Sequence, residues 1–140
     1  MLKFHPKQGT VLFSKFDGGF REPEMVKSRP VVVLSKEMAT RPKLCTVVAL
    51  SATASTPAMP YHLRLSLPVP KGVGLRPDCW VKGDMIYALS FDRLSLYRVG
   101  GRGDGGRRTY WGRPLDADIF RQIQRAVLHG LGLSNLTKSL

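Results

Sequence analysis

Two short, unbroken apolar runs limit what this chain can fold into. Residues 30–35 and 44–50 consist almost entirely of valine, leucine and other small or apolar side chains. Continuous apolar runs of this length are typical of strands that are buried on both faces. Pro30 fits only at the start of its strand, because proline has no N–H to donate to a neighbouring strand. Arg29 is therefore expected at the mouth of a buried strand.

Shorter strand-like segments accompany these two runs. Residues 9–16 are rich in β-branched and aromatic side chains, and residues 62–67 alternate leucines with polar side chains. Residues 79–89 and 92–99 also have the composition of strands, and Gly83 is expected to form a bulge or bend within the first of them. The sequence thus predicts five to seven short strands.

The last third of the chain has the periodicity of an amphipathic helix over residues 115–131. Asp116 is placed to cap its N-terminus, and Gly130 or Gly132 is placed to end it. A single domain over residues 1–140 is expected, mainly β, in which antiparallel strands curl into a small barrel that the helix partly covers. The apolar stripe of the helix consists of Leu115, Ile119, Ile123, Val127 and Leu131.

Net charge narrows the choice of partners. The 140 residues contain 22 Lys and Arg against 10 Asp and Glu, a formal charge of +12. Such an excess favours a polyanion, with nucleic acid ahead of an acidic protein or an anionic membrane surface. No stretch approaches the roughly 18 apolar residues that span a bilayer, and the N-terminus lacks the apolar run of a signal peptide. We therefore expect a cytoplasmic protein with no membrane partner.

The sequence contains no recognisable metal or cofactor site. Cys45 and Cys79 are 34 residues apart, neither belongs to a C-x-x-C motif, and the three histidines are scattered. Both cysteines lie in apolar, strand-like surroundings, where a free cysteine usually acts as a small buried hydrophobe. No metal and no cofactor are expected.

A basic barrel without metal ligands can still cleave RNA, because the 2′-hydroxyl is a nucleophile that the substrate itself supplies. The protein must align the backbone, move a proton and stabilise charge on the phosphate. Arg29 suits the last task, because its planar guanidinium binds two phosphate oxygens. Ser51 and Thr53 follow the other buried strand and reach the same site if the two strands pair. Spacing alone leaves structural roles open for the arginine and for this hydroxyl-rich turn.

Residues 98–113 combine six glycines with five arginines and one aspartate. The segment predicts a flexible hairpin whose return strand is residues 109–111. In one interpretation the arginines bind RNA phosphates while Tyr110 or Trp111 stacks on bases. In the other, the tip is solvated and Trp111 belongs to the core. The sequence does not decide between them.

Several motifs follow one another in a specific order, and together they resemble the MazF/PemK toxins of bacterial type II toxin–antitoxin pairs. The likeness covers about residues 8–133 and ends with the helix. The motifs are Gly9-Thr10-Val11, Arg29-Pro30-Val31-Val32-Val33, Val47-Val48-Ala49-Leu50-Ser51-Ala52-Thr53, His62-Leu63-Arg64-Leu65 and Trp80-Val81-Lys82-Gly83-Asp84-Met85-Ile86.

The resemblance implies an SH3-like barrel that acts as a homodimer, a metal-independent endoribonuclease specific for short sequences in single-stranded RNA. It implies cleavage to 2′,3′-cyclic phosphate and 5′-hydroxyl ends, and neutralisation by an acidic antitoxin. Carried over by position, Arg29 stabilises the phosphate and is a candidate general acid. Ser51 stands where the family usually has a catalytic threonine, with Thr53 as the alternative hydroxyl. Glu24 matches an acidic residue of the first loop that helps to shape the site.

Two positions depart from the family pattern, and two other functions stay open. Met85 replaces a common glutamine and Tyr87 a common arginine, which leaves the base specificity undetermined. By resemblance, the same fold also occurs in toxins that bind DNA gyrase through the C-terminal helix, and a basic barrel can bind nucleic acid without catalysis. Arg29 together with Ser51 favours the nuclease. The candidate RNA-binding side chains are Lys27, Arg64, Arg98, Arg102, Arg107 and Arg108.

Overall fold

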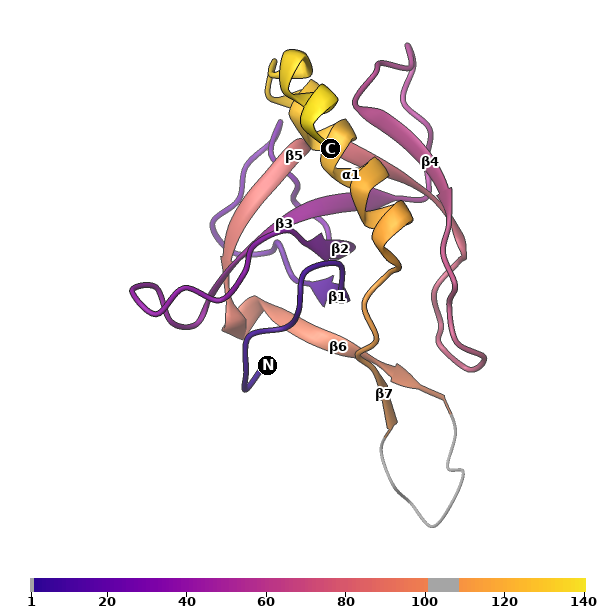
Figure 1. Ribbon diagram of the computed structural model, residues 1–140. Coiled ribbons are helices and arrows are strands. Elements are labelled where there is room, and N and C mark those ends of the chain that lie inside the picture. Colours follow the sequence, from indigo (N-terminus) through magenta and orange to yellow (C-terminus); the bar gives the residue numbers. More distant parts are fainter. Residues whose placement is uncertain (1, 101–108) are drawn as a thin grey trace.

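Seven antiparallel strands form one curved sheet in the computed structural model, which describes residues 2–100 and 109–140 (Figure 1). In space the strands follow the order β4-β5-β3-β2-β1-β6-β7, so that β4 and β7 remain as edges within the described chain and the barrel-like sheet does not close. The expected mainly β fold with a C-terminal helix is confirmed. The strands are β1 (Val11–Ser14), β2 (Arg29–Val33), β3 (Leu44–Ser51), β4 (His62–Ser66), β5 (Asp78–Ser90), β6 (Leu94–Val99) and β7 (Thr109–Trp111).

The two apolar runs form neighbouring central strands that are buried on both sides. Val31, Val32 and Val33 of β2 are all fully buried, as expected for a continuous apolar run. One face of the sheet, which includes Val32, packs against helix α1 (Ala117–Gly130). The other face, which includes Val31 and Val33, packs against the N-terminal segment and the loop that follows β1.

Helix α1 lies very close to β5, at the strand position where a bulge was expected (Figure 1). The pairing of β3 with β5 jumps from Val48–Ile86 to Ala49–Lys82, which leaves three extra residues on β5 beginning at Gly83. A Cβ atom on Gly83 would stand 2.3 Å from the carbonyl oxygen of Ala126 on α1. Glycine is thus required at this position for the approach of the helix as well as for the bulge.

Capping groups define both ends of α1. Its N-terminus is capped by Asp116, whose carboxylate accepts a hydrogen bond from the Ile119 N–H at 2.9 Å. Of the two candidate terminating glycines, Gly132 takes the left-handed conformation after the helix, with φ of +75°. The helix is shorter than the expected span because Leu115 is held in an extended strap by its hydrogen bond to the Gly9 carbonyl. A 3₁₀ helix, η2 (Ser134–Ser139), follows and was not predicted.

The hairpin of β6 and β7 settles the position of Trp111. Its indole is 5% exposed and packs in the helix-side core beside Tyr97, so the interpretation in which Trp111 stacks on RNA bases is wrong. Tyr110, the next residue toward the tip, is 46% exposed because alternate strand residues face opposite sides. Three of the arginines expected to bind RNA, Arg102, Arg107 and Arg108, lie outside the described residues.

Candidate active site

A row of side chains crosses the sheet at the end where β2 begins and β3 ends. Ser51 on β3 pairs with Trp80 on β5, and Trp80 pairs with Arg64 on β4. The antiparallel register of β2 and β3 continues the row to Arg29. Directly opposite residues point to the same face of a sheet. That face lies away from α1, because Val81, the neighbour of Trp80, belongs to the helix-side core.

Arg29 and Ser51 are in direct contact in this row. The Arg29 Nη1 donates a hydrogen bond to the Ser51 Oγ at 3.3 Å, and the backbone N–H of Thr53 donates to the same oxygen at 3.1 Å. Ser51 is buried and Arg29 is half-buried. The Arg29 Nε is buried and has no hydrogen-bond partner within the described chain. Buried donors are nearly always paired in proteins, so this N–H is a candidate donor to a bound ligand.

The structure separates the two candidate hydroxyls. Ser51 is the one that touches the guanidinium, whereas the Thr53 side chain is exposed and only its backbone takes part in the contact. Ser51 already accepts two hydrogen bonds, so its own O–H remains available as a donor. Of the two candidates, Ser51 is thus the hydroxyl in contact with Arg29.

The loop after β1 forms a cavity of about 630 Å³ against Arg29. Glu24 and Lys27 line it together with Met85 of β5. Glu24 does not contact Arg29 through a hydrogen bond; its carboxylate accepts one from the Arg21 backbone N–H at 2.6 Å and holds a turn of the loop. Lys27 is exposed on the cavity wall. Glu24 therefore shapes the loop beside Arg29, and Lys27 adds positive charge there.

Tyr87, one of the departures from the family pattern, anchors this loop. Its hydroxyl accepts a hydrogen bond from the Met25 N–H at 2.8 Å, and its ring packs edge-on against Phe16 and Phe20. Burial raises the pKa of Tyr87, so it stays a neutral phenol. The other end of the loop is held by Arg93, which donates to the carbonyl oxygens of Lys15, Asp17 and Gly18.

A second cavity, of about 250 Å³, lies on the other side of the Arg29–Ser51 contact. Arg76 and Asp78 supply its further charged groups. Arg29 lines both cavities, so the contact stands between two hollows of the surface. An extended ligand that crosses the site has room on either side of the guanidinium.

Lys82 is a buried charged residue on the face of Arg29 and Ser51 that the sequence analysis did not single out. It lies on β5 opposite Ala49 and His62, and only 9% of it is exposed. Its Nζ donates a hydrogen bond to the Ser55 Oγ. Burial lowers the pKa of Lys82; Asp84 counteracts this in part, and repulsion from Arg29 adds to the lowering. The available signal was a lysine that directly follows the apolar residues Cys79, Trp80 and Val81.

The remaining expected RNA-binding residues lie apart from one another. Arg64 is exposed on the edge strand β4, at the end of the Arg29–Ser51 row. Arg98 is exposed on β6, four residues beyond Leu94, which corresponds to about 13 Å along the strand. Because Leu94 pairs with Ser14, the neighbour of Arg29 on β1, the structure does not bring Arg98 to the site.

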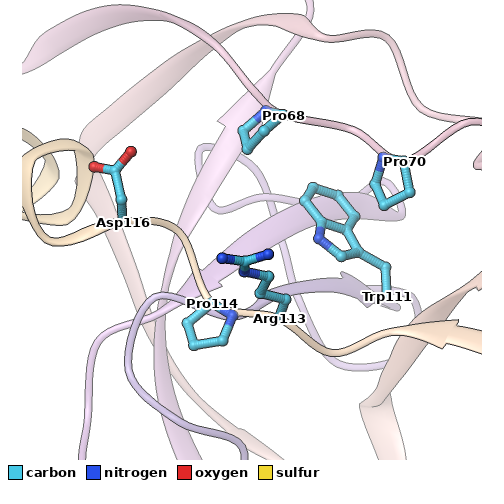
Figure 2. A pocket seen from close by; sticks show the side chains of 6 residues that line it. All are labelled: Pro68, Pro70, Trp111, Arg113, Pro114 and Asp116. Atoms are coloured by element: carbon cyan, nitrogen blue, oxygen red, sulfur yellow. The ribbon is translucent and has the colours of Figure 1, made fainter.

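Another cavity, of about 560 Å³, lies beside the strap that joins β7 to α1 (Figure 2). Figure 2 shows the Arg113 side chain reaching between prolines, with Trp111 beside it. The charged groups here are Arg113 and Asp116, and Asp116 already caps α1. None of the residues expected to be catalytic lines this cavity. Its lining residues are Pro68, Pro70, Trp111, Arg113, Pro114 and Asp116.

No metal-binding cluster is found among residues 2–100 and 109–140, where no three His, Cys, Asp or Glu side chains gather closely enough. Cys45 and Cys79 are free and buried, and burial raises the pKa of each thiol to about 11. Both thiols therefore stay protonated near neutral pH, which fits an apolar packing role. In the same part of the chain, no helix has the length and apolar character that crossing a membrane requires.

Solved structures define the fold class. MazF from Deinococcus radiodurans matches with a TM-score of 0.58 and 18% identity, over 93% of this chain and 99% of that chain. An endoribonuclease in complex with its cognate antitoxin, from a mycobacterial species, matches with a TM-score of 0.55 and 19% identity, over 92% and 97% of the two chains. The fold is therefore that of the MazF toxins.

The sequence itself gives the family. The model for the PemK-like, MazF-like toxins of type II toxin–antitoxin systems matches residues 7–131. An uncharacterized protein of Haemophilus influenzae is 28% identical over 148 residues, with 96% of each chain covered. The putative uncharacterized protein YifN of Escherichia coli is 27% identical over 154 residues, with 96% of this chain and 97% of YifN covered. The chain belongs to the PemK-like, MazF-like toxin family, which confirms the resemblance seen in its motifs.

Proposed function

We propose that this toxin is an endoribonuclease that cleaves single-stranded RNA at the Arg29–Ser51 site without a metal ion. The observation that carries the proposal is the contact between the half-buried Arg29 guanidinium and the Ser51 hydroxyl, with the Arg29 Nε left without a partner. Membership of the toxin family and a structural relative described as an endoribonuclease support it. The same arrangement has no evident use in a toxin that only binds another protein.

In the proposed reaction the RNA 2′-hydroxyl attacks the adjacent phosphorus while the bond from phosphorus to the 5′-oxygen breaks. The products are a 2′,3′-cyclic phosphate and a 5′-hydroxyl end. The free N–H groups of Arg29 bind the phosphate oxygens and stabilise the charge that builds up on them. Ser51 accepts from Arg29 and from the Thr53 backbone, so its O–H donates to a phosphate oxygen.

The cavities and positive charges around Arg29 suggest a path for the RNA, and the net positive charge suggests an acidic protein partner. The nucleotides on either side of the scissile bond occupy the two cavities beside Arg29, with Lys27 and Arg64 near their phosphates. An antitoxin with an acidic segment complements the net charge of +12. A relative whose structure is described as a complex with its cognate antitoxin supports this partner. We also propose, from the family resemblance, a cytoplasmic homodimer.

The test is incubation with a long single-stranded RNA in the presence of EDTA, followed by chemical mapping of the ends. We expect cleavage to 5′-hydroxyl and 2′,3′-cyclic phosphate ends, because the nucleophile comes from the substrate and needs no metal. A DNA strand of the same sequence should stay intact, since it lacks the 2′-hydroxyl. Intact RNA, 5′-phosphate ends or cleavage of the DNA would contradict the proposed function.

Substitution at Ser51 should affect the reaction far more than substitution at Thr53. Ser51→Ala is expected to slow single-turnover cleavage about 10²-fold, because it removes one donor to the transition state. Thr53→Ala keeps the backbone N–H that makes the observed contact, so its rate should stay within about threefold of wild type. Ser51→Thr, which retains the hydroxyl, is the matched control. A larger loss in Thr53→Ala would reverse the assignment.

A further inference from the structure

Lys82 carries a charge in a place where proteins seldom keep one. Lysine is rarely buried without a carboxylate partner, yet Lys82 is 9% exposed and its hydrogen-bond partner is the Ser55 hydroxyl. In the described part of the chain, no Asp or Glu lies within ion-pair distance of its ammonium. A buried ammonium without an ion pair is costly, and Asp84 offsets this cost only in part, so Lys82 is a candidate for ligand binding or catalysis.

The strand register directs this lysine to the candidate active site. Lys82 pairs with Ala49, and Ser51 is the next β3 residue on that same face. Arg29 approaches Ser51 from β2, on one side, and Lys82 lies on β5, on the other side. The opposite face of β5 is covered by α1, which comes within van der Waals reach of Gly83. Lys82 therefore lies on the same face of the sheet as Arg29 and Ser51.

Two positive charges, those of Arg29 and Lys82, lie near each other on this face of the sheet. Arg29 and Lys82 are close enough for mutual repulsion, and the guanidinium leaves its buried Nε without a partner. A phosphate bound by Arg29 and Ser51 would lie beside the strand position of Lys82, because β5 pairs with β3 and Lys82 is one same-face position from Trp80, the partner of Ser51.

We propose that Lys82 is a catalytic residue of this site and that its Nζ accepts the proton of the RNA 2′-hydroxyl. This inference rests on the proposed nuclease function. The lone pair of a neutral Nζ takes the proton as the O–H bond breaks and the bond from the 2′-oxygen to phosphorus forms. The bond from phosphorus to the 5′-oxygen breaks, and the 5′-oxygen takes a proton from water. The Lys82 ammonium then returns its proton to the solvent.

The surroundings of Lys82 lower its pKa, which is the direction that a proton-accepting amine requires. Burial lowers its pKa, and the repulsion from Arg29 on β2 acts in the same direction. Asp84, on β5 itself, acts against them. His62 faces Lys82 from β4, and Ser55 faces it from the loop after β3. The rate should therefore rise with pH as Lys82 loses its proton.

The experiment compares Lys82→Met and Lys82→Arg with wild type in single-turnover cleavage between about pH 5.5 and pH 9. We expect both variants to lose about 10²–10⁴-fold in rate and to lose the ascending limb of the pH profile, because neither methionine nor the permanently charged arginine accepts the proton. Binding of an RNA with a 2′-deoxy residue at the cleavage position should stay close to wild type. Lys36→Met, at an exposed lysine after β2, is the matched control.

Asp84→Asn tests the pH profile of cleavage, which would not change if Lys82 had only a structural role. Removing this carboxylate favours the neutral amine, so the ascending limb should shift to lower pH while the maximal rate stays near wild type. Lys82→Met removes a buried charge and is expected to unfold at the same temperature as wild type or higher, which excludes loss of folding as the cause of a slow rate.

Distinct outcomes would overturn the inference. Near wild-type cleavage by Lys82→Arg would mean that the lysine acts only through its charge, and near wild-type cleavage by Lys82→Met would mean that it has no role. An unchanged pH limb in Asp84→Asn would assign that limb to another group. If wild type itself leaves the RNA intact, the proposed function fails, and this result differs from a failure of Lys82 alone.

Discussion

Arg29→Ala is expected to reduce single-turnover RNA cleavage by at least about 10³-fold. The guanidinium is the group that would bind the phosphate oxygens, and removing one preorganised donor already costs about 10²–10³-fold in rate. Arg29→Lys should recover little, because an ammonium keeps the charge but lacks the planar fork and the contact to Ser51. The measurement is the rate of appearance of 5′-hydroxyl ends at saturating enzyme.

Folding of the Arg29 variants is checked by thermal unfolding. Without Arg29 the buried Ser51 Oγ still accepts a hydrogen bond from the Thr53 N–H, and the unpaired Arg29 Nε is removed, so the unfolding temperature should change little. Arg121→Ala, at an exposed arginine on α1, is the matched control and should cleave like wild type. If Arg29→Ala retains cleavage within tenfold of wild type, the active site lies elsewhere.

Gly83→Ala is expected to destabilise the protein by about 3 kcal/mol and to lower its unfolding temperature by about 10 °C. The added Cβ would stand 2.3 Å from the Ala126 carbonyl oxygen and 2.8 Å from that of Tyr61. Both are backbone atoms that cannot rotate away, so either α1 or the residues just before β4 must move. The apolar contacts of α1 with the sheet, centred on Ile123 and Val127, would then loosen.

Equilibrium unfolding in urea measures this loss directly. Gly112→Ala is the control, because no atom beyond its chain neighbours lies within 4 Å of the added methyl group and its backbone is not left-handed. Its free energy of unfolding should stay within about 0.5 kcal/mol of wild type. A Gly83→Ala protein as stable as the control would show that α1 can shift on β5 at little cost.

Local sequence patterns were sufficient for the strands and for part of the site. The apolar run that follows Pro30 placed Arg29 at the start of a buried strand, and the Asp116 cap located the beginning of the helix. The order of the strands was not predictable, because β1 pairs with β6 across some 80 residues of intervening chain and no local pattern records that pairing. Which of Ser51 and Thr53 contacts Arg29 depended on another strand pairing, that of β2 with β3.

Lys82 was missed for a related reason. Lys82 and Tyr87 are five positions apart, so in an unbroken strand their side chains would face opposite sides of the sheet. The three extra residues of the bulge invert the alternation, so that Lys82 and Tyr87 share one face while Val81 turns toward α1. A bulge signalled by one glycine gives no count of its residues, so the orientation of the lysine follows only from the three-dimensional pairing.

The length of the bulge in β5 determines which side chains face Arg29. An odd number of extra residues between Lys82 and Ile86 turns the lysine toward Arg29, whereas an even number would turn it toward the helix. A single deletion in this stretch would therefore exchange a polar side chain for an apolar one on the face of Arg29, although every remaining residue type would be unchanged.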